Sequence, residues 1–378
     1  MRLLDRYVLQ NFLRAYLYCI AAFVSIWLVF DISDNVSTFL DLRASVLQVA
    51  QYYLVQMPQI LVILLPVALL LALLFSLGRM SRTNEIVSML TAGVSVPRLL
   101  LPLIAMGAVT AAVSGALNYS LAPHAEVTRK SFFDGLRPDA RDRGLMGQIF
   151  RNRAENRTWF IQRMQPGENH FTTVQILQQD ANDNIVQNYM ATSAVYHPEQ
   201  KAWELQLVRV VSYDETGNIT AEQTVESLMK TDWSETPFRL SSSNMRAELM
   251  SLPELRDYLR FNSDFPPSLL APFSTHFWYR LALPWTCLVV VFIAAPLAIG
   301  FGRGGVLTSV AAAIGLVFSM NFLTHLFLAL GEGDRIPPWA AAWTPNFLFA
   351  LLGLVLLYLR STNREARSLN PMARRAVA

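Results

Sequence analysis

Residues 54–77, LVQMPQILVILLPVALLLALLFSL, decide the fold of this chain. The stretch holds no Asp, Glu, Lys or Arg, and a helix needs only about 20 apolar residues to cross the hydrocarbon core of a bilayer. Pro58 and Pro66 lie within it. Prolines are tolerated in membrane helices because neighbouring helices satisfy the backbone groups that they free. The stretch therefore predicts a membrane-spanning helix.

Charge-free stretches of comparable length occur in five other places. The chain of 378 residues is 53% hydrophobic and only 16% charged, whereas soluble domains carry about 25% charged residues. Cys19 and Cys287 both fall inside predicted spans, which argues against a disulfide framework. The sequence thus predicts an integral membrane protein with six spans: Ala15–Phe30, Leu54–Leu77, Leu99–Leu121, Phe277–Phe301, Val306–Leu330 and Trp339–Leu359.

The residues between the third and fourth predicted spans have a different pattern. Their polar and apolar side chains alternate, and Pro, Gly, Asn and Asp separate the alternating segments, which is typical of strands. The spacing favours a sandwich or jelly roll over a βαβ fold. The predicted strands are Arg157–Arg163, Thr173–Gln179, Ile185–Tyr196, Ala202–Tyr213 and Ile219–Val225.

The predicted fold class is therefore a mixed α and β membrane protein, with three helices on each side of an inserted β-jelly-roll domain. Residues 1–121 hold the first three spans and a short helix near 81–93, which follows the second span. Residues 122–275 hold the β domain and a connector helix, opened by a capping box at Ser251–Glu254. Residues 276–378 hold the last three spans and a basic tail.

Basic residues are unevenly distributed among the segments that join the spans. Lys and Arg concentrate on the cytoplasmic side of membrane proteins. The loops after the first and fifth spans instead mix one Arg each, Arg43 and Arg335, with acidic residues. Both termini are therefore predicted to be cytoplasmic and the central domain to lie on the other side. The residues that carry this prediction are Arg2, Arg6, Arg14, Arg79, Arg82, Arg98, Arg303, Arg360, Arg364, Arg367, Arg374 and Arg375.

The motifs of several enzyme classes are missing from the sequence. It has no P-loop, no His-Glu-x-x-His, no Cys-x-x-Cys and no Gly-x-Ser-x-Gly, and its five histidines lack ligand spacing. Charge pairs of the kind that relay protons inside membranes are also missing. We expect no metal site, no cofactor bound by this chain and no catalytic residue. Any transport must draw its energy from a partner.

The loop at 78–98 contains the first candidate site. Ser81 or Thr83 is expected to cap a short helix, and Gly93 to end it. Glu85 is an acidic residue in an otherwise basic loop, beside an apolar face of Ile86, Met89 and Leu90. Such a combination fits docking into a groove on a soluble partner; the alternative is an ordinary solvated carboxylate.

Two features inside the spans have both structural and functional interpretations. Asn321 and His325 lie four residues apart, hence on one face of a helix, with Thr324 beside them. They either line a substrate path or form a hydrogen bond between helices. Gly107, Ala111 and Gly115 recur every four residues and are interpreted as a packing face.

Several short motifs give the chain a resemblance to a known family, the LptF/LptG (YjgP/YjgQ) lipopolysaccharide-export permeases. They run in the family's order over nearly the whole membrane portion, and together they are specific although each is weak alone. They are Leu4-Asp5-Arg6-Tyr7, residues 84–93 (NEIVSMLTAG), residues 280–284 (RLALP), Ala295-Pro296-Leu297, Arg303-Gly304-Gly305, Pro337-Pro338 and residues 341–346 (AAWTPN).

The resemblance implies a function and a set of partners. Such permeases sit in the bacterial inner membrane, pair as F-type with G-type, and bind a cytoplasmic LptB-like ATPase dimer that uses ATP and Mg²⁺. An LptC-like single-span protein and an LptA-like periplasmic bridge take the lipopolysaccharide onward, and the β domain is periplasmic. The implied ATPase-coupling residues are Arg82, Glu85, Ile86, Met89 and Leu90. The implied substrate-path residues are Phe30, Arg43, Asn321 and His325.

One departure from the family concerns the outer end of the first span. Some members carry several basic residues there, facing lipid phosphates, whereas this chain has Asp31, Asp34 and Asp41 with Arg43 as the one basic residue. The phosphate contact then comes from Arg43 and the partner permease, or the lipid differs in charge. The Asp and Asn residues after the first span and the Ala-Trp-x-Pro-Asn motif favour the G-type subunit.

Two other functions compete with this one. The first is a membrane subunit of another ATPase-coupled system, for lipid or lipoprotein export or for mechanotransmission. Those proteins place their large outer domain after the first span, whereas here it follows the third. The second is a membrane enzyme or a structural scaffold. The missing catalytic motifs argue against an enzyme, and the loop around Glu85 argues against a scaffold.

Overall fold

The computed structural model describes residues 3–125, 128–129, 132, 145–164, 169–214, 216–242, 245–263, 265–301 and 306–361. It divides into two compact units, each described by itself. The membrane unit comprises Met1–Arg129, Ser251–Pro253 and Ala271–Ala378, and the β unit comprises Lys130–Met250 and Glu254–Leu270. The predicted motif Arg303-Gly304-Gly305 and the basic tail beyond Ser361 lie outside the described residues.

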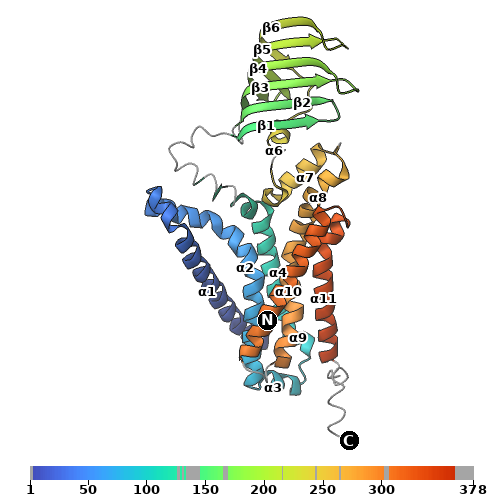
Figure 1. Ribbon diagram of the computed structural model, residues 1–378. Helices are drawn as coiled ribbons and strands as arrows, with labels where there is room; N and C mark the ends of the chain where they lie inside the picture. Colours follow the sequence, from blue (N-terminus) through green and yellow to red (C-terminus); the bar gives the residue numbers. More distant parts are fainter. Residues whose placement is uncertain are drawn as a thin grey trace. The chain divides into compact units, whose positions relative to one another are not determined.

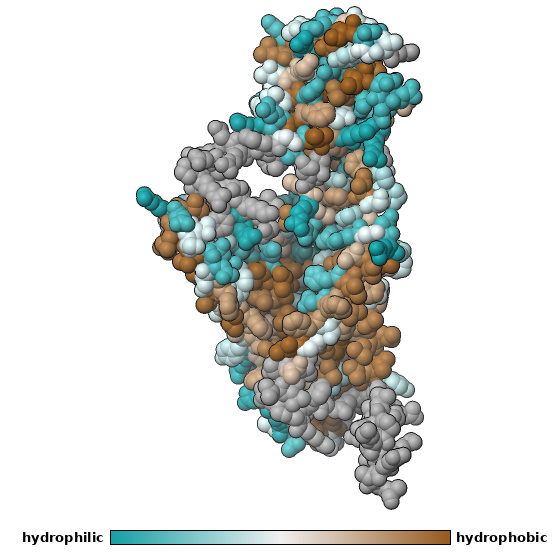
Figure 2. All heavy atoms as spheres, in the orientation of Figure 1, coloured by the Kyte–Doolittle hydropathy of each residue, from teal (hydrophilic) through white to brown (hydrophobic). Residues whose placement is uncertain are grey.

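Within the described residues, six helices are long and apolar enough to cross a membrane (Figure 1). Their apolar side chains cover the visible face of the membrane unit in a broad hydrophobic band (Figure 2). The predicted fold class, six spans with an inserted β domain, is therefore confirmed. The helical elements of this part are α1 (Leu3–Asp41), α2 (Val46–Arg82), α3 (Glu85–Thr91), α4 (Val96–Ala116), the π-helical turn η1 (Leu117–Leu121), α8 (Pro267–Ala282), the 3-10 turn η4 (Leu283–Trp285), α9 (Thr286–Phe301), α10 (Val306–Glu332) and α11 (Pro338–Ser361).

The first helix is much longer than the hydrophobic stretch inside it. Residues 31–41 continue α1 instead of forming part of an outer loop, because their polar side chains lie on exposed helical turns and no Pro or Gly interrupts them. Ser45 then opens α2 with a capping box, in which its hydroxyl accepts from the Gln48 amide and its own amide donates to the Gln48 side chain. The connection between the two helices is consequently only a tight turn.

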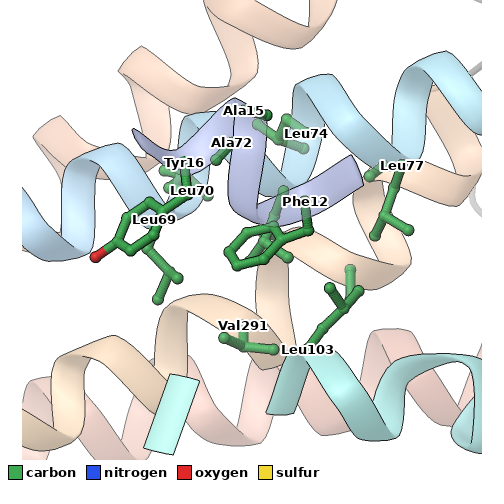
Figure 3. Close-up of a cluster of buried hydrophobic side chains, with 14 of the residues drawn as sticks. Phe12, Ala15, Tyr16, Leu69, Leu70, Ala72, Leu74, Leu77, Leu103 and Val291 are labelled. Atoms are coloured by element: carbon green, nitrogen blue, oxygen red, sulfur yellow. The ribbon is translucent and has the colours of Figure 1, made fainter. Parts of the chain in front are cut away.

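The core of the membrane unit forms where four helices meet. Phe12 and Ala15 of α1 pack onto α2, while Leu103 of α4 and Val291 of α9 contribute to the same cluster (Figure 3). The α2 contribution includes Leu69 and other fully buried leucines. Because α2 packs against α1, α9 and α10, it is the central helix of this unit.

The small-residue stripe on α4 is a packing face, as the sequence predicts. A methyl group built on Gly107 would lie 2.7 Å from Val291 Cγ2, and one on Gly115 would lie 3.4 Å from Pro284 Cγ. Glycine at these positions lets α4 approach α9 and η4 closely. Pro284 sits in the 3-10 turn that separates α8 from α9, so the fourth predicted span is two helices joined by a turn.

The β unit is built on one antiparallel sheet whose strands neighbour each other in chain order, from β1 to β6. The described strands thus form a single meander, which is simpler than the two-sheet sandwich or jelly roll that we expected. All five predicted strands are present, and the sequence did not single out β1. The strands are β1 (Leu145–Asn152), β2 (Arg157–Met164), β3 (His170–Gln179), β4 (Ile185–His197), β5 (Ala202–Tyr213) and β6 (Ile219–Lys230).

Aromatic side chains fill the buried face of this sheet. Trp203 lies 5.0 Å from Trp159 and 5.3 Å from Phe171 between ring centroids. Trp233, in the segment after β6, packs against Trp159 at 5.3 Å, and Leu240 of α6 joins the same cluster. The chain after the last strand therefore folds back over the sheet. The helices of this region are α6 (Pro237–Ser242), the 3-10 turn η3 (Ala247–Leu249) and α7 (Leu252–Phe261).

Candidate functional site: the short helix α3 and its neighbours

The connection between α2 and α4 consists of a turn, the short helix α3 and a second turn. Thr83 caps the C-terminus of α2, and Asn84 has a left-handed backbone, with φ 60°. Asn84, and not Ser81 or Thr83, is therefore the N-cap of α3, so our capping prediction was wrong. Arg82 ends α2 and does not belong to α3. Ala92 caps the other end of α3, and Gly93 follows with φ +87°, a backbone conformation that suits glycine.

The apolar face of α3 anchors it to the membrane unit. Ile86 is only 1% exposed and lies in the same core cluster as Phe12 of α1 and Met80 of α2. Met89 and Leu90 are partly buried and pack against that cluster. A seven-residue helix has little stability of its own in water, so these contacts hold α3 in place. A displacement of α3 therefore also displaces side chains of α1 and α2 in this cluster.

Glu85, at the first position of α3, is held by two hydroxyl groups. Tyr7 of α1 donates to Oε2 at 3.0 Å, and Thr83 donates to Oε1 at 2.9 Å. Both partners that the described residues provide for this carboxylate are neutral, so they leave its negative charge uncompensated. Arg82 is exposed and its Nε donates to the Gly78 carbonyl of its own helix. The surface of α3 thus offers one carboxylate and one nearby cation to a partner.

The four expected substrate-path residues fall into two groups on different elements. Phe30 is 68% exposed on α1, and Arg43 is an exposed residue of the turn that follows this helix. Asn321 and His325 are exposed on one face of α10. Helices α1 and α10 both pack against α2. The two groups therefore flank the central helix without forming one cluster.

Asn321 borders a small cavity among α2, α8, α9, α10 and α11. The cavity has a volume of about 120 Å³ and is lined largely by apolar side chains, including Pro66, Val290 and Met320. Asn321 donates to the Val317 carbonyl and Thr324 to the Met320 carbonyl, both within α10. Both hydrogen bonds stay within α10, so the two interpretations of this polar patch, a substrate path and a hydrogen bond between helices, stay predictions.

Hydrogen bonds between membrane helices occur elsewhere in the described residues. Asn346 of α11 accepts from Thr286 at 3.2 Å and donates to the Ala282 carbonyl at 2.8 Å. Asn118 and Arg280 bond each other twice, at 2.9 and 3.0 Å. These pairs join η1 to α8, and α11 to α8 and α9, and they leave the exposed side chains on α10 available for other contacts.

The described residues contain no group of three or more His, Cys, Asp or Glu side chains that could hold a metal ion. They do contain two site residues that sequence reasoning missed, Tyr7 and Thr83. Both hydroxyls point at Glu85, but Tyr7 is 78 residues away in the chain. A pattern within the loop cannot reveal such a partner.

Comparison with known proteins agrees with this arrangement of spans, β domain and loop helix. The family model described as "Lipopolysaccharide export system permease LptF/LptG" matches residues 6–359. The chain belongs to this family. Its members are permeases for lipopolysaccharide export, so the chain is a multi-pass inner-membrane permease.

Two curated relatives are similar to the chain over almost their whole length. Both are named lipopolysaccharide export system permease protein LptG, one from Escherichia coli strain K12 and one from Escherichia coli O6:H1 strain CFT073. Each is 23% identical over 364 residues, which cover 95% of this chain and 98% of the relative. The resemblance of the sequence motifs to this family is thereby confirmed. The two LptG relatives agree with the G-type that the motifs favour.

Proposed function

We propose that this chain is the LptG-type half of an ATP-driven transporter that extracts lipopolysaccharide from the inner membrane and passes it to a periplasmic bridge. Its energy comes from a cytoplasmic, LptB-like ATPase dimer that binds ATP and Mg²⁺, since the sequence lacks a P-loop. The observation that supports this proposal best is a carboxylate, Glu85, whose hydrogen-bond partners among the described residues are both neutral, on a short helix that apolar contacts hold in place.

The proposed ATPase-coupling residues are Arg82, Glu85, Ile86, Met89 and Leu90. Glu85 supplies the negative charge that a basic groove of the ATPase recognises. Hydrogen bonds between a carboxylate and a cationic side chain are stronger than those between neutral groups. Ile86 is fully buried, so its role is to hold α3 in place. Met89 and Leu90 are partly buried and partly open to the partner.

The proposed orientation puts both termini in the cytoplasm and the β unit in the periplasm. The distribution of basic residues supports it. The Tyr7–Glu85 hydrogen bond also supports it, because it requires the N-terminal end of α1 and the α2–α4 connection to lie on the same side. An LptC-like single-span protein would then meet the complex on the periplasmic side.

The proposed lipid path runs along α1 and α10, beside a paralogous F-type permease. Over the described residues these are the least buried of the six spans, and both expose bulky apolar side chains, such as Phe30 and Phe322. Such faces suit acyl chains and the facing helices of a second permease. Arg43 is positioned to meet lipid phosphate at the outer end of α1, and Asn321 and His325 line the α10 side.

Charge reversal at Glu85 tests this proposal. With Glu85→Lys, the ATPase dimer should no longer co-purify with the full permease pair in detergent, whereas Glu85→Gln should retain part of the binding. Asp257→Lys, at an exposed carboxylate of α7 in the β unit, is the matched control and should bind normally. Normal co-purification with Glu85→Lys would show that α3 is not the docking point.

A further inference from the structure

The N-terminal end of α1 is joined to α3 by a hydrogen bond, in which the Tyr7 hydroxyl donates to Glu85 Oε2 at 3.0 Å. The two helices also contribute to one core cluster, which includes Val8 and Phe12 of α1 and Ile86 of α3. Helix α3 is therefore held by α1 as well as by α2, to which it is joined in sequence.

Helix α1 is buried only near its two ends. Its buried residues are Val8, Phe12, Ala15 and Tyr16 near the N-terminus and Phe39 near the C-terminus. The turns between them are exposed or only partly buried within this chain. One side of these turns still packs against the core cluster, through Cys19, Ile20 and Phe23. A continuous helix passes displacement of one end along its hydrogen-bonded backbone. Its N-terminal fixed point is the place where it meets α3.

Both oxygens of Glu85 are used within the chain. Thr83 has three acceptors in reach, the Arg79 carbonyl at 3.2 Å, the Met80 carbonyl at 3.3 Å and Glu85 Oε1 at 2.9 Å, and the carboxylate is the nearest. Hydrogen bonds to an ionised acceptor are stronger than those between neutral groups. Two such donors restrict the Glu85 side chain to one orientation, so less rotamer freedom is lost when a partner binds.

We propose that Tyr7 is a positioning residue for Glu85 and links α3 to α1. This inference rests on the proposed docking role of Glu85. Tyr7 presents the carboxylate to the cation of the ATPase, and the same hydroxyl transmits displacement of α3 to the N-terminal end of α1. Docking at α3 and movement of α1, one of the two least-buried spans, are thereby joined by a contact that the α2–α3 connection does not provide.

The test is Tyr7→Phe in the full transporter, which removes one hydroxyl and keeps the ring. The affinity of the ATPase dimer for the permease pair should fall about 3- to 10-fold, the size expected for one lost hydrogen bond. Lipopolysaccharide exported per ATP hydrolysed should fall as well. Tyr18→Phe is the matched control, because Tyr18 is 75% exposed on the same helix, and it should leave both quantities unchanged.

A double-mutant cycle separates positioning of Glu85 from a general effect on folding. In a Glu85→Ala background, which removes both acceptor oxygens, Tyr7→Phe should change the ATPase affinity less than 2-fold. Thr83→Val should weaken docking, whereas Thr83→Ser, which keeps the hydroxyl, should restore it. The thermal unfolding midpoint of the permease should be unchanged by Tyr7→Phe.

Three outcomes have distinct meanings. Wild-type affinity and wild-type export per ATP with Tyr7→Phe overturn the inference and leave the role of Glu85 intact. An equal loss in the Glu85→Ala background also overturns it, because Tyr7 then acts without the side chain of Glu85. Normal docking with Glu85→Lys overturns the proposed function itself.

Discussion

Arg157 and Glu235 form a buried ion pair inside the β unit, with Arg157 Nη1 2.6 Å from Glu235 Oε2 and side chains that are 6% and 0% exposed. Asn152 donates to the same carboxylate at 2.9 Å, and the guanidinium lies 4.6 Å from the centre of the Trp233 ring. The pair joins the start of β2 to the segment after β6. It therefore fixes the segment that covers the aromatic face of the sheet.

Removing one partner of this pair should destabilise the β unit. Glu235→Leu leaves the buried guanidinium with Glu155, a partly exposed carboxylate 2.7 Å away, as its remaining ion-pair partner among the described residues. The expected cost is therefore at most about 3–5 kcal/mol of unfolding free energy, the range for a buried pair that loses one partner. Hydrogen exchange of β1 and β2 amides in the full-length protein measures it. The double variant Arg157→Met with Glu235→Leu should recover most of the loss, since no unpaired charge remains. Equal destabilisation by the single and the double variant would contradict this explanation.

The close approach of α4 to α9 predicts a size limit at Gly107. Gly107→Ala puts a methyl group into the space of Val291 Cγ2, and overpacking of this kind costs about 1–3 kcal/mol. Thermal unfolding in detergent should show a lower midpoint, and adding Val291→Ala should restore it. Gly78→Ala is the matched control, because its new methyl group meets nothing within 4 Å. A lower midpoint for Gly78→Ala alone would argue against the packing explanation.

One pair on the sheet predicts a pH dependence. His197 Nε2 lies 2.8 Å from Glu204 Oε2, and hydrogen bonds from His197 and then Ser227 lower the pKa of Glu204. A carboxyl whose folded pKa is depressed contributes stability above its unfolded value, about 4.3, and loses it as the pH falls through the folded pKa. Hydrogen-exchange protection of β4, β5 and β6 should therefore decrease below about pH 4.3.

The variant Glu204→Gln provides the control for this pH dependence. It should flatten the change in protection of β4 to β6 across the same range, because the amide does not titrate. Protection elsewhere in the sheet should keep its wild-type dependence. A wild-type profile at β4 to β6 in Glu204→Gln would assign the effect to other groups.

Photo-crosslinkers on α1 and α10 test the proposed lipid path. Crosslinkers at Phe30, Arg43 or Asn321 should capture lipopolysaccharide in native membranes. A crosslinker at Leu354, 50% exposed on α11, is the control for random lipid contact and should capture much less. Capture of lipoprotein alone at the first three positions would favour a lipoprotein-release system.

Hydropathy located the spans because each lies in a long stretch without charge, but it did not predict the length of the helices. In α1 the charged turns from Asp31 onward continue the helix, since nothing in their sequence breaks it before Arg43, which has a left-handed backbone with φ 50°. The length of an apolar stretch indicates how much of a helix contacts lipid. The length of the helix itself depends on where residues interrupt its backbone.

Strand β1 shows where alternation of polarity fails as a signal. Gln148 is buried in this strand while Ile149 is 58% exposed, so at these two positions polarity runs opposite to burial. The strand is specified by its antiparallel register with β2, in which Phe150 pairs with Trp159. Such pairing depends on residues outside the strand, and so the sequence of β1 alone did not reveal it.

The candidate site was predictable only in part, for a similar reason. The loop itself pointed to Glu85 and the apolar residues after it, because charge and helical spacing are local properties. The donors that hold the carboxylate come from α2 and from α1, and the α1 donor is brought near only by the packing of Phe12 and Ile86 in one core. Tertiary contacts of this kind have no local pattern.

ATP-driven export of lipopolysaccharide by this permease is tested most directly in proteoliposomes that contain the permease pair, the ATPase dimer and the LptC-like protein. Transfer of lipopolysaccharide to the soluble bridge protein would be measured with and without ATP. Transfer should require ATP, and Glu85→Lys in this chain should abolish it. ATP-independent transfer, or full ATP-driven transfer with Glu85→Lys, would contradict the proposed coupling through α3.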